Sequence, residues 1–256
     1  MRRCSAITSV RSATVRGSAP PLSLHAWLRF DAIERLLPPD ATTLLEIGAG
    51  QGSAGALLSG RFAYVGLEPD EVSFKAAVSR IGAKGTVLNE TAEAYEPSEP
   101  FEVVCAFEVL EHIEDDGAAL VHWIRHLRPG GWLLLSVPAG RHRFGPTDVK
   151  AGHYRRYDRA DLRALLDRTG LGDVEILAYG FPLGHALEAG RNLYARRRTE
   201  ETPLEERTAA SGRWLQPPEW AARLMYVVSA PFRYAQRPFG RTSLGTGLVA
   251  RAKKTG

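Results

Sequence analysis

The stretch TLLEIGAGQG (residues 43–52) decides the fold of this chain. It begins as a short apolar strand and runs directly into three closely spaced glycines, Gly48, Gly50 and Gly52. Glycine permits positive φ angles and lets backbone N–H groups approach a ligand closely at the start of a following helix. A dinucleotide-binding fingerprint would need its third glycine at position 53, which is Ser53, so the spacing disfavours a dehydrogenase.

Around this stretch, apolar runs of strand length alternate with stretches of helical periodicity. Further strands are expected at 64–67, 86–88, 103–107, 132–137, 173–179 and 247–252. Helices are expected at 24–37, 72–81, 118–127 and 158–169. This alternation predicts βαβ units, and therefore an α/β fold with a doubly wound, mostly parallel sheet.

The positive charge of the chain is concentrated at its two ends. The 256 residues carry a net charge of +4, but residues 1–30 hold five arginines and residues 233–256 hold four arginines and two lysines, with no acid in either segment. The part between them, residues 31–232, therefore carries −7, which disfavours a nucleic-acid partner. Residues 1–23 are expected to be a disordered basic segment, with an organelle transit peptide as the alternative and the cytoplasm as the expected location.

Composition excludes two further classes of protein. Cys4 and Cys105 lie far apart in the sequence, which rules out a disulfide framework. The longest stretch without a charged residue, 47–60, has 14 residues and is rich in glycine, whereas a membrane-spanning helix needs about 20 apolar residues. A globular protein that carries its site on an α/β fold is therefore expected.

Residues 181–242 are much longer than an ordinary connection between strands. Helices are expected at Leu183–Arg196 and 219–230, separated by a charged surface loop at 196–203. Aromatic residues and arginines interleave in this insertion. It is predicted to form the acceptor pocket or lid, and its amphipathic pattern also suits an anionic lipid surface or a solvated helix face.

Glu68 ends the second expected strand, 22 residues after Glu46. A carboxylate at the tip of this strand can accept hydrogen bonds from both hydroxyls of a ribose. Together with the glycine loop, this position favours ribose binding over a solvated loop carboxylate.

Residues 24–180 resemble the class I S-adenosylmethionine-dependent methyltransferases. The resemblance rests on Glu46 with its glycine loop, on Glu68, and on three later motifs, Thr91-Ala92-Glu93, Phe107-Glu-Val-Leu-Glu-His112 and Leu127-Arg-Pro-Gly-Gly131. It implies a seven-stranded sheet whose last strand is antiparallel, with S-adenosyl-L-methionine as the cofactor. The chain would then divide into a basic segment 1–23, a cofactor-binding core 24–180, a helical insertion 181–242, and a final strand with a basic tail at 243–256.

The same resemblance assigns roles within the cofactor site. The glycine loop would face the methionine part, Thr91 and Ala92 would flank the adenine, and Phe107 and Glu108 would border the methionine. Thr91 stands where many family members have Asp, and Pro129–Gly131 would form a turn. The expected cofactor-binding residues are therefore Glu46, Gly48, Gly50, Gly52, Glu68, Thr91, Ala92, Phe107 and Glu108.

His112 and His153 are the candidate catalytic residues. Methyl transfer from a sulfonium needs mainly proximity and orientation of the acceptor, and a general base helps where the acceptor is a hydroxyl. Histidine is suited to that role near neutral pH. The alternative is structural, with His112 bonded to backbone and His153 to Asp148, while Arg155 and Arg156 bind an anionic substrate or brace carboxylates.

A second interpretation combines Glu108, Glu111, His112 and His153, which resemble the metal-binding set of small-RNA 3′-terminal 2′-O-methyltransferases. Such ligands suit Mg²⁺ or Mn²⁺. The acidic middle of the chain and the occurrence of this motif in metal-free relatives, including quinone-biosynthesis O-methyltransferases, favour a site without metal. The expected function is O-methylation of a small-molecule acceptor (a secondary metabolite, sugar or quinone-like lipid), and the alternatives are the RNA enzyme and a non-catalytic cofactor-binding module.

Overall fold

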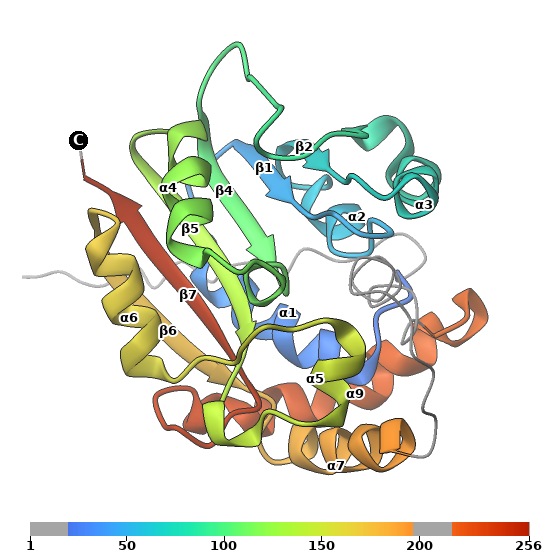
Figure 1. Cartoon of the computed structure of the whole chain (residues 1–256). Coiled ribbons are helices and arrows are strands. Elements are labelled where there is room, and N and C mark those ends of the chain that lie inside the picture. The colour runs from blue at the N-terminus through green and yellow to red at the C-terminus, as the bar shows by residue number, and fades with distance from the viewer. Residues whose placement is uncertain (1–19, 197–216, 256) are drawn as a thin grey trace, which may run out of the picture.

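The computed structural model describes residues 20–196 and 217–255. A seven-stranded sheet in the order β3-β2-β1-β4-β5-β7-β6 lies at its centre (Figure 1). The strands are β1 (Thr43–Ile47), β2 (Ala63–Leu67), β3 (Gly85–Leu88), β4 (Phe101–Phe107), β5 (Leu127–Pro138), β6 (Leu171–Tyr179) and β7 (Gly247–Lys254). All seven expected strands are present, each within a few residues of its predicted place.

The first five strands run parallel, and β7 runs antiparallel to both of its neighbours, β5 and β6. The predicted seven-stranded, mostly parallel sheet with an antiparallel last strand is confirmed. β1 and β4 lie side by side at the middle of the parallel part, where strand order reverses. Ligands of doubly wound sheets bind outside the carboxyl ends of the strands at such a reversal, so the fold itself marks the site.

Helices cover both faces of the sheet, because successive side chains of a strand point to opposite sides. The helices are α1 (Leu24–Leu36), α2 (Gly55–Leu58), α3 (Glu71–Ile81), α4 (Asp116–Trp123), α5 (Pro146–Ala151), α6 (Arg159–Arg168), α7 (Leu183–Arg196) and α9 (Ala222–Gln236). Leu45 points into a core shared with α4 and α6, while Leu44 points into a second core shared with α1, α3 and α9. Strands buried on both faces are typical of parallel sheets.

Three local expectations differ from the structure. The helix expected at 118–127 ends at Trp123 and tightens into a 3₁₀ turn, Ile124–His126, so that Leu127 already pairs with Phe101 in the sheet. The turn expected at Pro129–Gly131 is a bulge within β5, where the pairing jumps from Phe101↔Leu127 to Val103↔Trp132. Extra residues in one strand bend it without ending the ladder.

The third difference concerns the late insertion. Its second helix was expected to end at residue 230, before Pro231, yet α9 continues through this proline to Gln236. Buried Gln236 holds the end of α9 in place, since its amide donates to Leu28 O at 2.9 Å and its Oε1 accepts from Gly180 N at 2.8 Å. Tertiary contacts thus outweigh the hydrogen bond that a proline removes.

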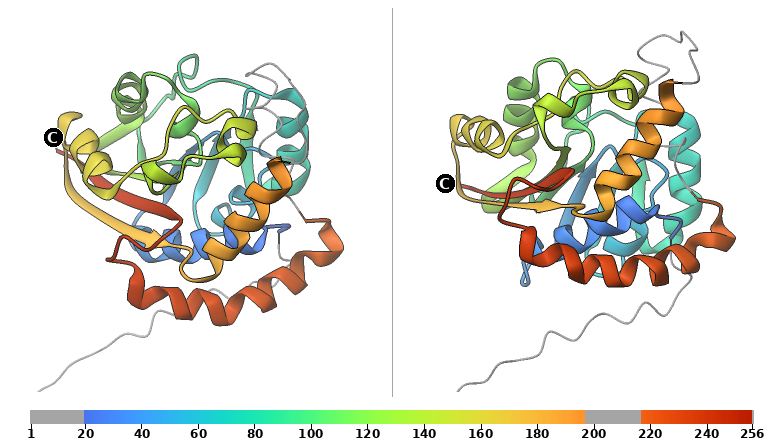
Figure 2. Two further views of the ribbon diagram at one scale, coloured as in Figure 1. Left: turned by 60° about the horizontal axis from the view of Figure 1, so that its bottom comes forward. Right: turned by 90° about the horizontal axis from the view of Figure 1, so that it is seen from below.

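The two insertion helices pack on the body of the fold. α9 lies along α1, with Tyr226 against Trp27, and α7 lies against α5 (Figure 2). The charged loop expected at 196–203 and the expected disordered segment up to residue 19 lie outside the described residues. Within the described part of the chain, no helix is long and apolar enough to cross a membrane.

Candidate active site

The glycine loop follows β1 at the carboxyl end of the sheet. Gly48, Gly50 and Gly52 have φ angles of +70°, +54° and +75°, which side-chain-bearing residues adopt only under strain. A Cβ at Gly48 would lie 2.6 Å from the Val109 side chain, whereas a Cβ at Gly50 would meet nothing within 4 Å. The loop is therefore packed against the protein at one end and open at Gly50, as a backbone cradle for a ligand requires.

Glu68 lies beside this loop at the end of β2. Its Oε2 accepts from Gly50 N at 2.7 Å, and its Oε1 accepts from Asp70 N at 2.9 Å. Asp70 in turn caps α3 by accepting from Ser73 N at 2.9 Å. The carboxylate that the sequence marks for a ribose is thus held against the open end of the glycine loop.

Glu46 has a different environment. It is buried, and its Oε2 accepts from Tyr64 Oη at 2.6 Å on the side of the sheet that α1 covers. Burial raises the pKa of Glu46 to about 7, although the hydrogen bond from Tyr64 and the charge of Arg29 oppose the rise. Its expected cofactor contact stays a prediction, because its carboxyl group serves the core beneath the loop.

Thr91 and Ala92, expected beside the adenine, lie in the turn after β3. Thr91 is exposed and its Oγ1 accepts from Ala94 N at 3.3 Å, while Ala92 is buried. The Ala92 carbonyl accepts from His122 and His126 at 3.0 and 3.1 Å. These bonds fix the backbone of the turn at the edge of the crevice.

Glu108 follows β4 and is the centre of a polar network. Its φ of +57° is unusual for a residue with a side chain, and such strain concentrates at functional sites. Its Oε1 accepts from Ser136 Oγ at 2.9 Å and from Tyr179 Oη at 3.2 Å, and it lies 3.5 Å from Arg29 Nη1. Residues of helix α1 and of strands β5 and β6 thereby orient the carboxylate of Glu108, directly after buried Phe107.

The two candidate catalytic histidines come together although 41 positions separate them in the sequence. The rings of His112 and His153 lie 4.7 Å apart between centroids, nearly perpendicular. Glu111 lies beside them, with its Oε1 3.9 Å from His153 Nε2. The 3₁₀ turn Leu110–His112 supplies two of these residues and the loop after α5 supplies the third.

Burial controls the charge of this cluster. It raises the pKa of Glu111 well above its ordinary value, with help from the neighbouring charge of Glu108. It lowers the pKa of His112 to about 4, and the charge of His153 adds to the effect. Both carboxyl oxygens of Glu111 and Nδ1 of His112 are buried without a hydrogen-bond partner among the described residues.

His153 is oriented from its other side. Its Nδ1 lies 2.9 Å from Asp148 Oδ1, and Asp148 also forms a two-pronged ion pair with Arg156 at 2.8 Å. Arg156 reaches Glu188 of α7 as well. The contact expected between His153 and Asp148 is present, and the role of His153 stays a prediction. Arg156 pairs with carboxylates, as Arg155 does with Asp116 at 3.0 Å.

The metal interpretation fits three of its four residues. Glu111, His112 and His153 each offer a ligand atom, and these atoms lie within 4.8 Å of one another. If a metal bound here, the Asp148–His153 bond would hold the His153 ring in its ligating orientation. Glu108 lies outside the group, since Arg29, Ser136 and Tyr179 already engage its carboxylate.

Three further residues belong to the site and were not predicted from the sequence: Ser136, Tyr179 and Arg29. Ser136 and Tyr179 lie near the ends of expected strands, and that position could have marked them. Arg29 belongs to a helix far upstream, and only the packing of α1 on the sheet brings it to Glu108.

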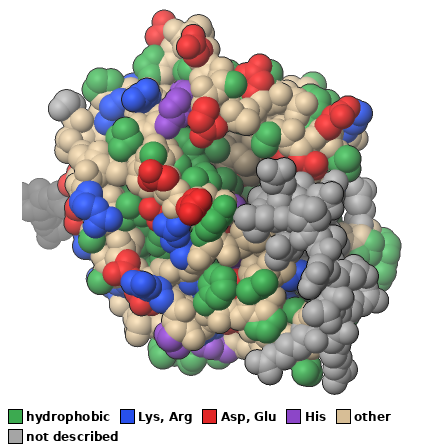
Figure 3. Space-filling model, in the orientation of Figure 1, with side chains coloured by type: hydrophobic (Ala, Val, Ile, Leu, Met, Phe, Trp, Pro, Cys, Tyr) green, Lys and Arg blue, Asp and Glu red, His purple; other side chains and the backbone are tan. Residues whose placement is uncertain are grey.

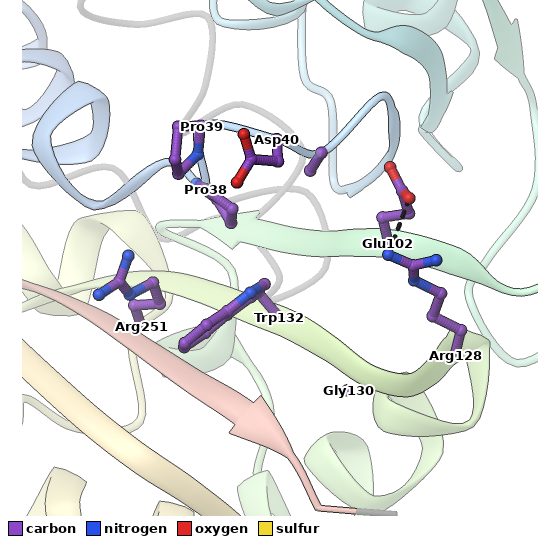
Figure 4. Close-up of a pocket in the computed structure, with 9 residues that line it drawn as sticks. Pro38, Pro39, Asp40, Glu102, Arg128, Gly130, Trp132 and Arg251 are labelled. Atoms are coloured by element: carbon purple, nitrogen blue, oxygen red, sulfur yellow. Dashed lines mark ion pairs between the residues drawn. The ribbon is translucent and has the colours of Figure 1, made fainter. Parts of the chain in front are cut away.

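A separate cavity lies at the other end of the strands, away from the glycine loop (Figure 4). It is lined by Trp132, Arg251 and the Glu102–Arg128 ion pair, near the amino ends of β1 and β4. Glu102 also accepts from Thr43 N, so these groups hold the strand ends together. The cavity is remote from the histidines and gives no support for a second active site.

Comparison with known proteins places this site in a family. A family model described as a methyltransferase domain matches residues 25–176, more than half of the chain, and the chain therefore belongs to this methyltransferase family. A probable S-adenosylmethionine-dependent methyltransferase of Mycobacterium tuberculosis is 29% identical over 233 residues, which cover 88% of this chain and 82% of that protein.

A ubiquinone biosynthesis O-methyltransferase of Paramagnetospirillum magneticum is 34% identical over 114 residues. The match covers 42% of this chain and 45% of that protein, so the chain spans about half the length of this relative. Among solved structures, this chain is similar to a Haemonchus contortus phosphoethanolamine N-methyltransferase with bound S-adenosyl-L-methionine. The TM-score is 0.56 at 17% identity, and the match covers 89% of this chain and 53% of that one, which shows a shared fold.

The chain is therefore a member of the class I S-adenosylmethionine-dependent methyltransferases, enzymes whose cofactor is S-adenosyl-L-methionine. This family membership disfavours the dehydrogenase. Acidic and basic side chains are interspersed over the described face shown in Figure 3, without the basic patch that a nucleic-acid footprint requires.

Proposed function

We propose that the protein methylates a hydroxyl group of a small molecule, with His153 as the general base. The observation that carries this proposal is the Asp148–His153 bond of 2.9 Å beside the crevice. A carboxylate on Nδ1 holds the imidazole in one tautomer and leaves Nε2 as the proton acceptor. The O-methyltransferase named above supports this chemistry as a related protein.

The cofactor supplies an electrophilic methyl group on its sulfonium. The chain's own residues would hold the acceptor in line with it, and this positioning accounts for most of the rate. While the methyl group moved from the cofactor sulfur to the acceptor oxygen, Nε2 of His153 would take up the hydroxyl proton, and Asp148 would stabilise the resulting imidazolium. His112, whose pKa burial lowers to about 4, stays neutral and adds no charge that would oppose this step.

The cofactor cradle would consist of the glycine loop, Glu68 and the turn with Thr91 and Ala92. The insertion 181–242 would form the acceptor side of the pocket. Calorimetric titration with S-adenosyl-L-methionine tests the cradle, because Glu68→Ala should weaken binding at least tenfold through loss of the ribose contact. Glu71→Ala, on exposed α3 nearby, is the matched control and should bind as the wild type does.

The base is tested by turnover in a screen of phenolic, sugar and quinol acceptors, each with and without a carboxylate or phosphate group, with S-adenosylhomocysteine as the measured product. His153→Ala should lose at least 100-fold in kcat while cofactor affinity is retained. His142→Ala, an exposed histidine outside the cluster, is the control. Equal turnover of both variants would remove His153 from the mechanism.

A metal-assisted version of the same reaction is the second candidate, favoured by the unpartnered atoms of Glu111 and His112. A divalent ion there would polarise the acceptor oxygen. Titration with Mn²⁺ alone should then stabilise the wild type against heat but leave Glu111→Gln unchanged. No stabilisation of the wild type would exclude this version, and with it the RNA-enzyme alternative that depends on the metal.

We also propose that α9 contacts an anionic membrane surface, from which a lipid-like acceptor would reach the crevice. Four apolar or aromatic residues here are exposed, by 80%, 52%, 58% and 65%: Trp220 in the 3₁₀ turn before α9, and Leu224, Val227 and Tyr234 in α9 itself. No acid occurs from residue 220 to 256. Leu224→Asp should abolish cosedimentation with phosphatidylglycerol vesicles. Val121→Asp on α4 should not, and equal binding of both variants would refute the contact.

A further inference from the structure

An arginine of the insertion, Arg191 on α7, lies in a cluster of like charges beside the Glu108 network. His25 of α1 lies next to this network, since its ring is 5.3 Å from the ring of Tyr179, which donates to Glu108. The charges of four arginines, Arg191, Arg29, Arg156 and Arg143, act on the His25 ring. Burial and these four charges hold the pKa of His25 well below its ordinary value. His25 is therefore neutral, bonded to Thr246 Oγ1 at 2.9 Å.

The other arginines of the cluster have carboxylate partners. Arg29 pairs with Glu108, Arg156 pairs with Asp148 and Glu188, and Arg143 pairs with Glu188. The three carboxylates of Glu108, Asp148 and Glu188 thus pair with these three guanidinium groups. Any additional cation in this cluster is a surplus positive charge.

Arg191 is that surplus cation. Among the residues that the structure describes, it has no ion pair or hydrogen bond, and its Nε is buried. The acids that act on it, Glu108 and Asp148, are already engaged by other groups. Burial lowers the pKa of Arg191, although arginine keeps its proton at any physiological pH.

A half-buried guanidinium with no counter-ion among the described residues is unfavourable for folding, so replacing Arg191 by an apolar residue should stabilise the protein if the charge serves no ligand. A guanidinium binds planar carboxylates and phosphates through parallel N–H bonds. The position beside Tyr179 and Glu108, on the insertion side of the site, is where an acceptor would enter.

We propose that Arg191 binds an anionic group, a carboxylate or a phosphate, of the methyl acceptor. The inference rests on the proposed function and adds to it the substrate class, a small anionic molecule. A neutral acceptor would leave the positive charge of the cluster uncompensated, so the site selects against it. Arg191 is a specificity-determining residue in this scheme, separate from the base and from the cofactor cradle.

The test measures thermal unfolding with two anions, inorganic phosphate and benzoate, at constant ionic strength set with chloride. The wild type should gain about 3–6 °C when one of them is tenfold above its Kd. Arg191→Gln should gain nothing, and Arg191→Leu should melt above the wild type without anions. Arg141→Gln, which alters an exposed ion pair, is the control and should respond as the wild type does. The anion with the larger effect identifies carboxylate or phosphate as the recognised group.

Equal responses of wild type and Arg191→Gln, or no response of the wild type to either anion, would overturn the proposal. Calorimetry with S-adenosyl-L-methionine separates this result from failure of the proposed function. Arg191→Gln should bind the cofactor within twofold of the wild type. A wild type that binds cofactor but ignores both anions refutes only the acceptor class, whereas a wild type that binds no cofactor refutes the proposed function.

Discussion

Gly52→Ala is expected to destabilise the protein by about 2–4 kcal/mol. Gly52 has a φ of +75°, and its new Cβ would lie 2.9 Å from the Cα of Ala77 and 3.2 Å from Cδ1 of Ile81. The left-handed backbone costs roughly 1–2 kcal/mol for alanine, and overpacking against a helix backbone costs about 1–3 kcal/mol. The less flexible unfolded chain returns about 0.4–1 kcal/mol.

Gly50→Ala is the matched substitution two residues earlier. Its φ is +54°, but its Cβ would meet nothing within 4 Å, so the expected loss is about 1 kcal/mol. The added methyl group would instead occupy the open side of the loop, beside Glu68. Affinity for S-adenosyl-L-methionine should fall at least tenfold in a protein that is otherwise nearly intact.

Urea unfolding measures the first effect and calorimetric titration with the cofactor measures the second. For a chain of this size, 1 kcal/mol corresponds to about 2–4 °C in Tm, so the two variants should differ clearly on heating. Equal stability of the variants would show that α3 yields to the new methyl group. Wild-type affinity of Gly50→Ala would refute the cradle.

Three further predictions concern buried polar groups. Burial raises the pKa of Glu46 to about 7, so the folded protein keeps a proton that the unfolded chain releases above about pH 4.5. The free energy of unfolding should therefore fall as the pH rises from about 4.5 to about 7. Glu46→Gln should remove this fall and gain up to about 3 kcal/mol at pH 8, which urea unfolding at several pH values would measure. The pKa of His112 is lowered to about 4, so only the unfolded chain takes up a proton there as the pH falls from about 6.5. His112→Asn should therefore lose less stability than the wild type between pH 6.5 and 4. Equal losses would contradict the lowered pKa of His112. Gln236→Ala leaves Leu28 O and Gly180 N without their partner and should lower the free energy of unfolding by about 2–4 kcal/mol. A shift of the urea midpoint equivalent to less than about 1 kcal/mol would mean that water replaces the amide.

The positions of the strands along the chain and the place of the cofactor loop could be predicted from local sequence. Apolar runs such as 132–137 report burial directly, and the glycines after β1 report backbone angles that few other residues adopt. These signals act over a few neighbouring residues, so periodicity and spacing capture them. The extension of α9 through Pro231 was missed because its cause, the anchoring of Gln236, lies in distant elements.

In the candidate site, too, some residues could be predicted from the sequence, whereas their contacts depend on the tertiary structure. His112 and His153 were identifiable by residue type and by their motifs, and so was Glu68. Tertiary structure alone decided that the two histidines meet at Glu111, that Arg29 pairs with Glu108, and that Arg191 is left without a counter-ion among the described residues. Charge states depend on burial and on neighbours from other elements, and only the folded chain brings these groups within a few ångströms of one another.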